Sequence, residues 1–393
     1  MSLNETPLAN RVHIGIFGKR NAGKSSIINA MTGQSLAIVS DVAGTTTDPV
    51  LKAMELLPLG AVVMIDTPGL DDVGELGLMR VQKAYQILNK ADIALVVIDG
   101  TVGITAEDEA IIERIKAKNI PYLIVKNKMD LMENMEEGKD TISVSAATGQ
   151  NIYELKERIG RLAPKEDDSR KVVRDILKPG DFVVLVVPID SAAPKGRLIL
   201  PQQQTIRDVL EAGAAAIVTR DNELEKTLQN LGKNPRLVIT DSQVFGTVSK
   251  IVPEDVELTS FSILMARYKG DLEANVKGAR VLEKLKDGDK VLISEGCTHH
   301  RQCEDIGTVK LPRWIKEYTG KELEFCFTSG TEFPIDLSEY AMIVHCGGCT
   351  LNEREMKYRL KCAEDQQIPM TNYGICIAYL NGILERSIRP LGI

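Results

Sequence analysis

The stretch Gly18–Ser25 limits the possible folds of this chain more than any other part of the sequence. It reads Gly-Lys-Arg-Asn-Ala-Gly-Lys-Ser and fits the GxxxxGK(S/T) phosphate-binding pattern. A short apolar run, 12–17, precedes it, and a helical pattern begins at residue 26. In a strand-loop-helix context, glycines let successive backbone N–H groups point at phosphate oxygens, and the helix start adds its own N–H groups. The stretch therefore predicts a nucleotide site.

Different side chains of this loop are expected to contact the phosphates and the metal ion. Lys24 is expected to reach the β and γ phosphates, and the Ser25 hydroxyl to ligate Mg²⁺. The rest of the phosphate-binding set is Gly18, Asn21, Ala22, Gly23 and Ser26.

A second group of residues is expected to respond to the γ-phosphate. Thr46 is the natural second hydroxyl ligand of Mg²⁺, and Asp66, at the tip of an apolar strand, is placed to hold a metal-bound water. The N–H of Gly69 would meet the γ-phosphate and lose that contact on hydrolysis. We assign the catalytic contacts to Lys24, Thr46 and Gly69.

Base selection is predicted at two later positions along the chain. Asn127-Lys128-Met-Asp130 follows one strand, and Ser145-Ala146 follows the next. A carboxylate at Asp130 accepts hydrogen bonds from N1–H and the 2-amino group of guanine, which adenine does not offer. The four-residue motif is weak alone but strong in order with the phosphate loop, so the nucleotide is predicted to be GTP.

Strands and helices alternate along the whole chain, which predicts an α/β protein. The first part is expected to be a P-loop GTPase domain with a parallel, doubly wound sheet, followed by two smaller α/β domains. We place the domains at 1–168, 169–260 and 261–393, with a charged connection near residue 165. A single long helix is expected over 374–388.

The middle segment, 169–260, has few strands and no titratable cluster that suggests catalysis. About ninety residues with few strands make a thin core. We expect pairing with a second copy to supply the missing burial, so the segment is interpreted as an oligomerisation module of a homodimer.

The last segment carries every cysteine of the chain, seven in all, and three of its four histidines. Two predicted strands end at residues 294 and 344, and each runs directly into soft metal ligands at the same sheet edge. The first strand leads to Cys297, His299 and His300, and the second to His345, Cys346 and Cys349. Thiolates with imidazole suit zinc or an iron–sulfur cluster, and the spacing leaves both open. A dithiol redox motif would leave the third cysteine and the histidines unexplained.

The other four cysteines are weaker candidates for metal ligands. Cys326, Cys362 and Cys376 lie in strand or helix patterns, where cysteine is usually a small buried hydrophobe, and Cys303 is a reserve candidate.

The charge and hydropathy of the chain argue against some classes of binding partner. The net charge of −7 and the lack of Lys/Arg-rich runs argue against nucleic acid. No apolar run is long enough to span a bilayer, and no secretory signal opens the sequence, so we expect a cytoplasmic protein without membrane contact.

The first 160 residues resemble the translation-factor-related TrmE-Era-EngA-YfgK group of small GTPases, since all five sequence boxes are present. Asn21 stands where K⁺-activated members of this group place an asparagine that ligates the cation. The resemblance therefore implies GTP hydrolysis with Mg²⁺ and stimulation by K⁺.

The whole chain resembles the FeFe-hydrogenase maturation GTPases. That family carries Cys-x-His, a long spacer and His-Cys-x-x-Cys, which here are Cys297, His299, His345, Cys346 and Cys349. The resemblance implies a 4Fe-4S cluster on the three cysteines and a scaffold or carrier for the diiron subcluster. Its implied partners are two radical-SAM maturases and the apo-hydrogenase. The fourth cluster ligand stays open among His299, His300, His345, Glu304 and Asp305.

A second function class competes with this interpretation. A ribosome- or tRNA-associated GTPase with a zinc-binding C-terminal module would also explain a GTPase joined to cysteines and histidines. The acidic balance of the chain weighs against it.

Overall fold

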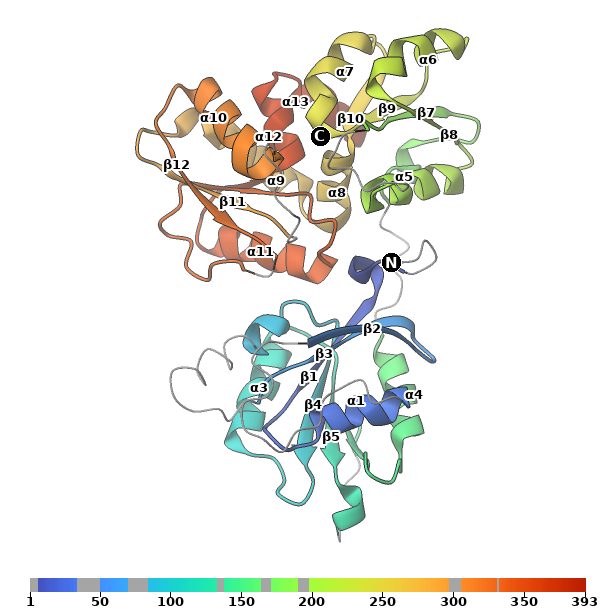
Figure 1. Ribbon diagram of the computed structural model, residues 1–393, viewed down its shortest axis with the longest axis vertical. Coiled ribbons are helices and arrows are strands. Elements are labelled where there is room, and N and C mark those ends of the chain that lie inside the picture. Colours follow the sequence, from blue (N-terminus) through green and yellow to red (C-terminus); the bar gives the residue numbers. More distant parts are fainter. Residues whose placement is uncertain are drawn as a thin grey trace. The chain divides into compact units, whose positions relative to one another are not determined.

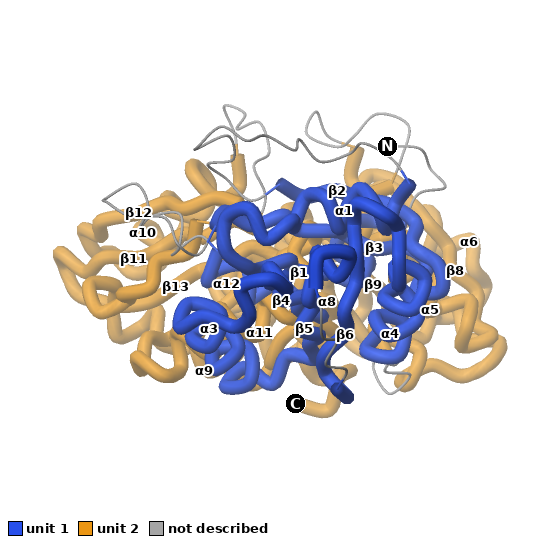
Figure 2. The backbone as a smooth tube through the Cα atoms, turned by 90° about the horizontal axis from the view of Figure 1, so that it is seen from below, with its two compact units in different colours: residues 1–167 blue, residues 168–393 orange. Residues whose placement is uncertain are grey.

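The computed structural model describes residues 6–33, 50–69, 84–132, 138–163, 171–189, 198–296, 305–330 and 332–393. The chain forms two compact units, Met1–Asp167 and Asp168–Ile393, coloured separately in Figure 2. The predicted boundary at residue 260 lies inside the second unit and stays a prediction.

The first unit is built on a six-stranded sheet in the order β2-β3-β1-β4-β5-β6. Only β2 runs antiparallel to its neighbour β3, and the other pairs are parallel. The strands are β1 (Val12–Phe17), β2 (Val50–Leu56), β3 (Gly60–Asp66), β4 (Ile93–Asp99), β5 (Tyr122–Asn127) and β6 (Thr141–Ser143). The described helices are α1 (Lys24–Thr32), α3 (Ala106–Ala117) and α4 (Ile152–Leu162).

Alternating apolar residues of these strands pack into two separate hydrophobic cores, one on each face of the sheet. In β4, Leu95 and Val97 pack with α1 and α4, whereas Ala94 and Val96 pack with α3. Figure 1 shows α3 on one side of this sheet and α1 and α4 on the other. A sheet buried on both faces needs apolar residues at successive positions, which is why its strands read as continuous apolar runs. The predicted doubly wound GTPase fold is confirmed.

The second unit contains two parallel four-stranded sheets, ordered β10-β9-β7-β8 and β12-β11-β13-β14. The first comprises β7 (Phe182–Val186), β8 (Ala215–Thr219), β9 (Leu237–Thr240) and β10 (Glu257–Ser260). The second comprises β11 (Lys290–Ser294), β12 (Glu324–Thr328), β13 (Met342–His345) and β14 (Met370–Asn372). The helices are α5 (Leu200–Glu211), α6 (Leu224–Asn230), α7 (Phe245–Ile251), α8 (Phe261–Lys269), α9 (Leu272–Ala279), α10 (Leu311–Thr319), α11 (Glu353–Asp365), α12 (Tyr373–Leu380) and α13 (Leu384–Ile388).

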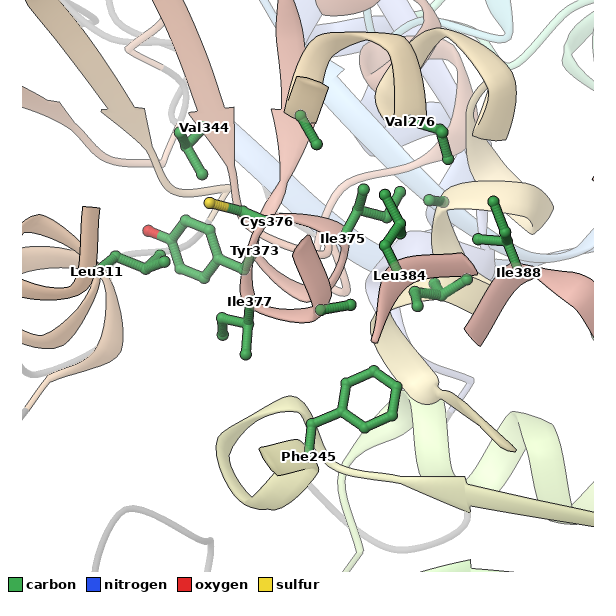
Figure 3. Close-up of a cluster of buried hydrophobic side chains, with 14 of the residues drawn as sticks. Phe245, Val276, Leu311, Val344, Tyr373, Ile375, Cys376, Ile377, Leu384 and Ile388 are labelled. Carbon is green, nitrogen blue, oxygen red and sulfur yellow. The ribbon is translucent and has the colours of Figure 1, made fainter. Parts of the chain in front are cut away.

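One hydrophobic core joins the two sheets of this unit. It contains Val184 of β7 and Val344 of β13, with Phe245 and Ile375 among the side chains packed around them. Figure 3 shows α12 contributing Tyr373, Ile375, Cys376 and Ile377 to it. Helices α12 and α13 of the same chain therefore cover part of the apolar surface of the middle segment.

The expected long helix over 374–388 was wrong in one respect. The chain forms two helices there, α12 and α13, separated by a turn at Gly382. Gly382 has a φ of 68°, a left-handed conformation that glycine adopts without strain and that ends a helix.

Candidate functional site

The phosphate loop follows β1 and ends at the first turn of α1. Gly18 has a φ of 143° and Gly23, which precedes the helix, a φ of 93°. A Cβ on Gly18 would lie 2.1 Å from the Val97 carbonyl oxygen, so β4 lies too close for any larger residue. Lys24 is buried, and its Nζ donates to the carbonyl oxygens of Gly18 (2.9 Å) and Lys19 (2.8 Å). The lysine ammonium thus lies inside the curve of the loop.

The two predicted magnesium-side groups that the structure describes lie together. The Ser25 hydroxyl donates to Oδ2 of Asp66 at 2.9 Å. Burial raises the pKa of the Asp66 carboxyl, and this hydrogen bond counteracts the shift. The hydroxyl of neighbouring Thr67 donates to the Ile16 carbonyl oxygen at 2.6 Å and ties the end of β3 to β1. An oxygen pair formed by the end of β3 and the first turn of α1 suits a hard cation such as Mg²⁺. Thr46 lies outside the described residues, and Gly69 is the last described residue after β3.

The base-selection residues meet the phosphate loop through one side chain. Nδ2 of Asn127 donates to the Ala22 carbonyl oxygen at 3.0 Å, and its Oδ1 accepts from the N–H of Ala146 at 3.1 Å. The Asn127 amide therefore joins three of the predicted boxes into one arrangement, although more than a hundred residues separate Ala22 from it. Asp130 is exposed. Its carboxylate is therefore accessible to a ligand.

Sequence reasoning missed Asp99, which lies at the end of β4. Its carboxylate pairs with the ammonium of Lys128 and accepts from the Thr101 hydroxyl at 2.6 Å. The position could have been found, because β4 ends beside β5 in any sheet of this order and Asp99 pairs with Asn127 in register.

Two of the three predicted cluster cysteines lie at the end of β13, beside the end of β11. Cys346 follows β13, and its Sγ accepts from the N–H groups of Gly296 (3.0 Å) and Gly348 (3.4 Å). Gly348 reaches this position with a φ of 60°. Burial raises the pKa of the Cys346 thiol to about 11, and that of Cys349 is raised for the same reason. Thiols in this environment become thiolates when a cation binds them.

Cys297 follows Gly296 directly but lies outside the described residues, as do His299, His300, Cys303 and Glu304. Among the described residues, no group of three cysteine, histidine or acidic side chains could hold a metal ion. The structure thus brings Cys346 and Cys349 to the end of β11, and the meeting of all three cysteines stays a prediction.

His345 is fully buried, and both its ring nitrogens are engaged. Nε2 accepts from Nη1 of Arg359 at 3.0 Å, and because a guanidinium only donates, the ring proton is on Nδ1, which donates to the Cys346 carbonyl oxygen at 2.7 Å. Burial and the Arg359 charge lower its pKa to about 3. In this arrangement His345 positions Cys346 and offers no nitrogen to a metal.

One carboxylate oxygen of Asp305 is also engaged in hydrogen bonds. Its Oδ2 accepts from the N–H (2.8 Å) and hydroxyl (2.9 Å) of Thr308 and caps the turn Ile306–Lys310. Of the open choices for a fourth cluster ligand, His345 and Asp305 are therefore disfavoured.

Two buried cations around the cysteines were missed by sequence reasoning. Arg359 of α11 is fully buried with Glu355, and Lys269 at the end of α8 is buried against the loop that holds Cys349. Burial lowers the pKa of Lys269 to about 8. Nothing in their local sequence distinguishes them from the solvated lysines and arginines typical of helices, so only the fold shows their burial.

Comparison with known proteins assigns the chain to a family. The model of the hydrogen maturase F dimerization domain matches residues 172–270, and that of the hydrogen maturase F tetramerization domain matches residues 273–390. Together they cover more than half of the chain. The chain belongs to the hydrogen maturase F family. A third model, of the 50S ribosome-binding GTPase, matches residues 13–128 and confirms a GTPase domain.

Individual relatives match the GTPase part. The tRNA modification GTPase MnmE of Laribacter hongkongensis is 36% identical over 157 residues, covering 37% of this chain and 33% of the relative. GTPase Der of Wolinella succinogenes is 36% identical over 195 residues, covering 44% of this chain and 40% of the relative. The matched region thus spans well under half of these relatives' own length.

A solved structure of an Era variant from Aquifex aeolicus bound to GDP and AlF4⁻ is 24% identical. The match covers 53% of this chain and 92% of the Era chain, with a TM-score of 0.36.

These comparisons bear on two further expectations. The alternative of a ribosome- or tRNA-associated GTPase with a zinc module is unsupported, since both models matched after residue 171 are hydrogen maturase models. In the part of the chain that the structure describes, no helix is long and apolar enough to cross a membrane.

Proposed function

We propose that this hydrogenase-maturation GTPase is a scaffold or carrier that binds a 4Fe-4S cluster and assembles or delivers the diiron subcluster of FeFe-hydrogenase. It would bind GTP with Mg²⁺ and hydrolyse it. The proposed cluster ligands are Cys297, Cys346 and Cys349.

The observation that carries the cluster proposal is the hydrogen bond from the Gly296 N–H to Cys346 Sγ. It joins the residue before Cys297 to a cysteine fifty positions later, at 3.0 Å. Two amide N–H groups aimed at one sulfur stabilise negative charge there, as a cluster thiolate requires. The donor set fits, because three cysteines are soft ligands suited to iron–sulfur chemistry. When bound, the cluster would supply an iron with a replaceable fourth ligand where another metal fragment docks.

The fourth ligand is proposed to come from the segment after Cys297. Both nitrogens of His345 and one carboxylate oxygen of Asp305 are engaged in hydrogen bonds. His299, His300 and Glu304 are therefore favoured. A nitrogen or oxygen donor leaves the site more open than a fourth thiolate would.

Iron content with a matched variant tests the cluster proposal. After anaerobic reconstitution, the wild-type chain should hold about four irons and four sulfides and absorb broadly near 400 nm, as a cubane cluster does. Cys346→Ala should lose most of the iron. Cys376→Ala is the control, because Cys376 is fully buried in the hydrophobic core and is not one of the proposed ligands. Equal iron in the two variants, or zinc in place of iron, would overturn the proposal.

We propose that K⁺ stimulates hydrolysis through Asn21. Asn21 is exposed, with a φ of 61°, in the loop between Gly18 and Gly23. Its side chain can therefore turn toward a cation beside the phosphates. Hydrolysis should be faster in KCl than in NaCl, and Asn21→Ser should remove the difference. An unchanged K⁺ response in the variant would assign the cation to other groups.

The chain is proposed to act as an oligomer, at least a homodimer. Its maturase models are named for dimerization and tetramerization. Sedimentation equilibrium at micromolar concentrations should give at least twice the chain mass of 43.2 kDa, whereas a monomer throughout would refute the proposal.

Finally, we propose that nucleotide state controls partner release. The partners are the radical-SAM maturases and the apo-hydrogenase, and coupling requires that GTP and GDP forms bind them with different free energies. Surface plasmon resonance with the GTP-analogue, GDP and empty forms tests this. Equal affinities and kinetics in all three would eliminate the coupling.

A further inference from the structure

Lys269 is a buried cation whose ammonium contacts backbone carbonyl oxygens. It ends α8, and only 4% of its surface is exposed. Nζ donates to three backbone carbonyl oxygens of one loop, those of Gly348 (3.2 Å), Cys349 (3.4 Å) and Leu351 (3.0 Å). Within the described residues, no carboxylate forms an ion pair with it.

The ionisable side chains that act on Lys269 include the two cysteines of the loop. Cys349 and Cys346 act on its ammonium more strongly than Glu353 does, once the thiols lose their protons. Burying a cation without a counter-charge is costly, and carbonyl dipoles offset only part of the cost. A site that becomes negative when occupied would supply the missing charge.

The loop held by Lys269 is the one that orients the two cysteines. The Gly348 carbonyl accepts from the Leu351 N–H (3.1 Å) as well as from Lys269, while the Gly348 N–H points at Cys346 Sγ. The Thr350 hydroxyl donates to the Gly296 carbonyl oxygen at 2.9 Å, which ties the loop to the end of β11. The Lys269 ammonium therefore supports the loop from the side of α8.

We propose that Lys269 is a positioning residue of the cluster site: its ammonium holds residues 348–351 in the conformation that presents Cys346 and Cys349, and its positive charge offsets the negative charge of the bound cluster. This inference rests on the proposed cluster function. A cluster held by three thiolates is negative, and reduction makes it more negative. A neighbouring buried cation therefore favours the reduced form and raises the reduction potential.

The experiment compares three variants of the full chain with the wild type. Lys269→Met removes the charge but keeps the length of the side chain, and Lys269→Arg keeps the charge. Lys277→Met removes a charge from an exposed lysine on the next helix, where solvent screens it. EPR-monitored redox titration of the reconstituted proteins gives the cluster potential. Hydrogen–deuterium exchange of the peptide 346–352, measured on the cluster-free proteins, reports the loop.

We expect Lys269→Met to disfavour reduction at least tenfold, a fall of about 59 mV for one electron. Lys269→Arg and Lys277→Met should stay within that margin of the wild type. In the cluster-free protein, peptide 346–352 should exchange at least tenfold faster in Lys269→Met, with the rest of the second unit unchanged.

An unchanged potential and unchanged exchange in Lys269→Met would overturn the inference, and so would faster exchange spread over the whole second unit. If Lys269→Met takes up no cluster, the exchange comparison alone decides. If the wild type itself takes up no cluster, the proposed function fails, while the exchange data still test the loop contact.

Discussion

Replacing Arg359 with methionine should strongly destabilise the second unit. Arg359 is fully buried, and its guanidinium binds Glu355 Oε1 at 2.9 Å, the Gly330 carbonyl oxygen at 2.8 Å and Nε2 of His345 at 3.0 Å. Methionine fills similar space but donates no hydrogen bond. The variant would leave the Glu355 carboxylate, which is only 4% exposed, without its positive partner. It would also leave the Gly330 carbonyl oxygen and Nε2 of His345 without their donor.

The magnitude follows from those three lost contacts. Removing one partner of a buried ion pair costs roughly 3–5 kcal/mol, because the other charge is left uncompensated. Each stranded neutral acceptor adds about 1 kcal/mol or more. We therefore expect a loss of at least about 5 kcal/mol, a large part of the roughly 5–15 kcal/mol that keeps a domain folded.

Urea unfolding followed by tryptophan fluorescence measures this directly. Trp314 is the single tryptophan of the chain and packs against the core of the second unit, so its emission reports that unit alone. Arg207→Met is the control: Arg207 also pairs with a glutamate four residues away, but 77% of its side chain is exposed. That variant should lose less than about 1 kcal/mol.

A double variant separates the charge from the packing. Replacing both Glu355 and Arg359 with methionine removes the stranded charge, so the double variant should be at least about 2 kcal/mol more stable than additivity of the single variants predicts. The reasoning would be refuted if Arg359→Met unfolded at the same urea concentration as the wild type. It would also be refuted if the stability losses of the two single variants simply added in the double variant.

Three further predictions concern the first unit. Asp130→Asn should weaken GTP binding by roughly 10²-fold or more, because two hydrogen bonds to a charged acceptor are lost, while the weak binding of ATP is unchanged; fluorescent-nucleotide titration measures both. Gly18→Ala should abolish nucleotide binding, since its Cβ would lie 2.1 Å from the carbonyl oxygen of Val97, and retained affinity would contradict the loop geometry. Burial lowers the pKa of His13 from 6.5 to about 4, so on acidification the unfolded chain takes up its proton first. The stability of the first unit should therefore fall between pH 6.5 and pH 4, by up to about 1.4 kcal/mol per pH unit. Calorimetry, with the first-unit transition recognised by its rise on adding GDP, should show a flatter pH dependence for His13→Gln.

The first unit was predictable because its motifs fix local geometry and topology together. A phosphate loop between a strand and a helix requires a parallel sheet, and the end of each strand then carries the next motif. Asn127 was predicted as part of the nucleotide site, but its bond to the Ala22 carbonyl was not, since that contact depends on the register of β5.

The second unit was less predictable because its core is shared. The sequence offers two strand-helix alternations, which predict two separate domains, and only the first of these was expected to have a thin core. Helix α12 is buried on nearly all sides, and only the tertiary structure shows that its residues complete the core of both sheets. A fully apolar helix has no preferred face, so periodicity does not say what covers it.

The proximity of Cys346 to the end of β11 was predictable, but the residues that support this cysteine were not. Strand tips and cysteine spacing brought Cys346 near the segment of Cys297. The roles of His345, Arg359 and Lys269 depend on burial, which a single charged or imidazole side chain in a sequence does not reveal. His345 read as a ligand candidate because imidazole beside thiols usually is one; here its hydrogen bonds to Arg359 and Cys346 explain it instead.

Cysteines from two distant strand ends are proposed to hold one iron–sulfur cluster. The direct test is the EPR spectrum of the reconstituted, reduced protein, compared among the wild type, Cys297→Ala and Cys346→Ala. We predict one paramagnetic centre in the wild type and its loss in both single variants. Survival of the same signal in either variant would contradict the claim.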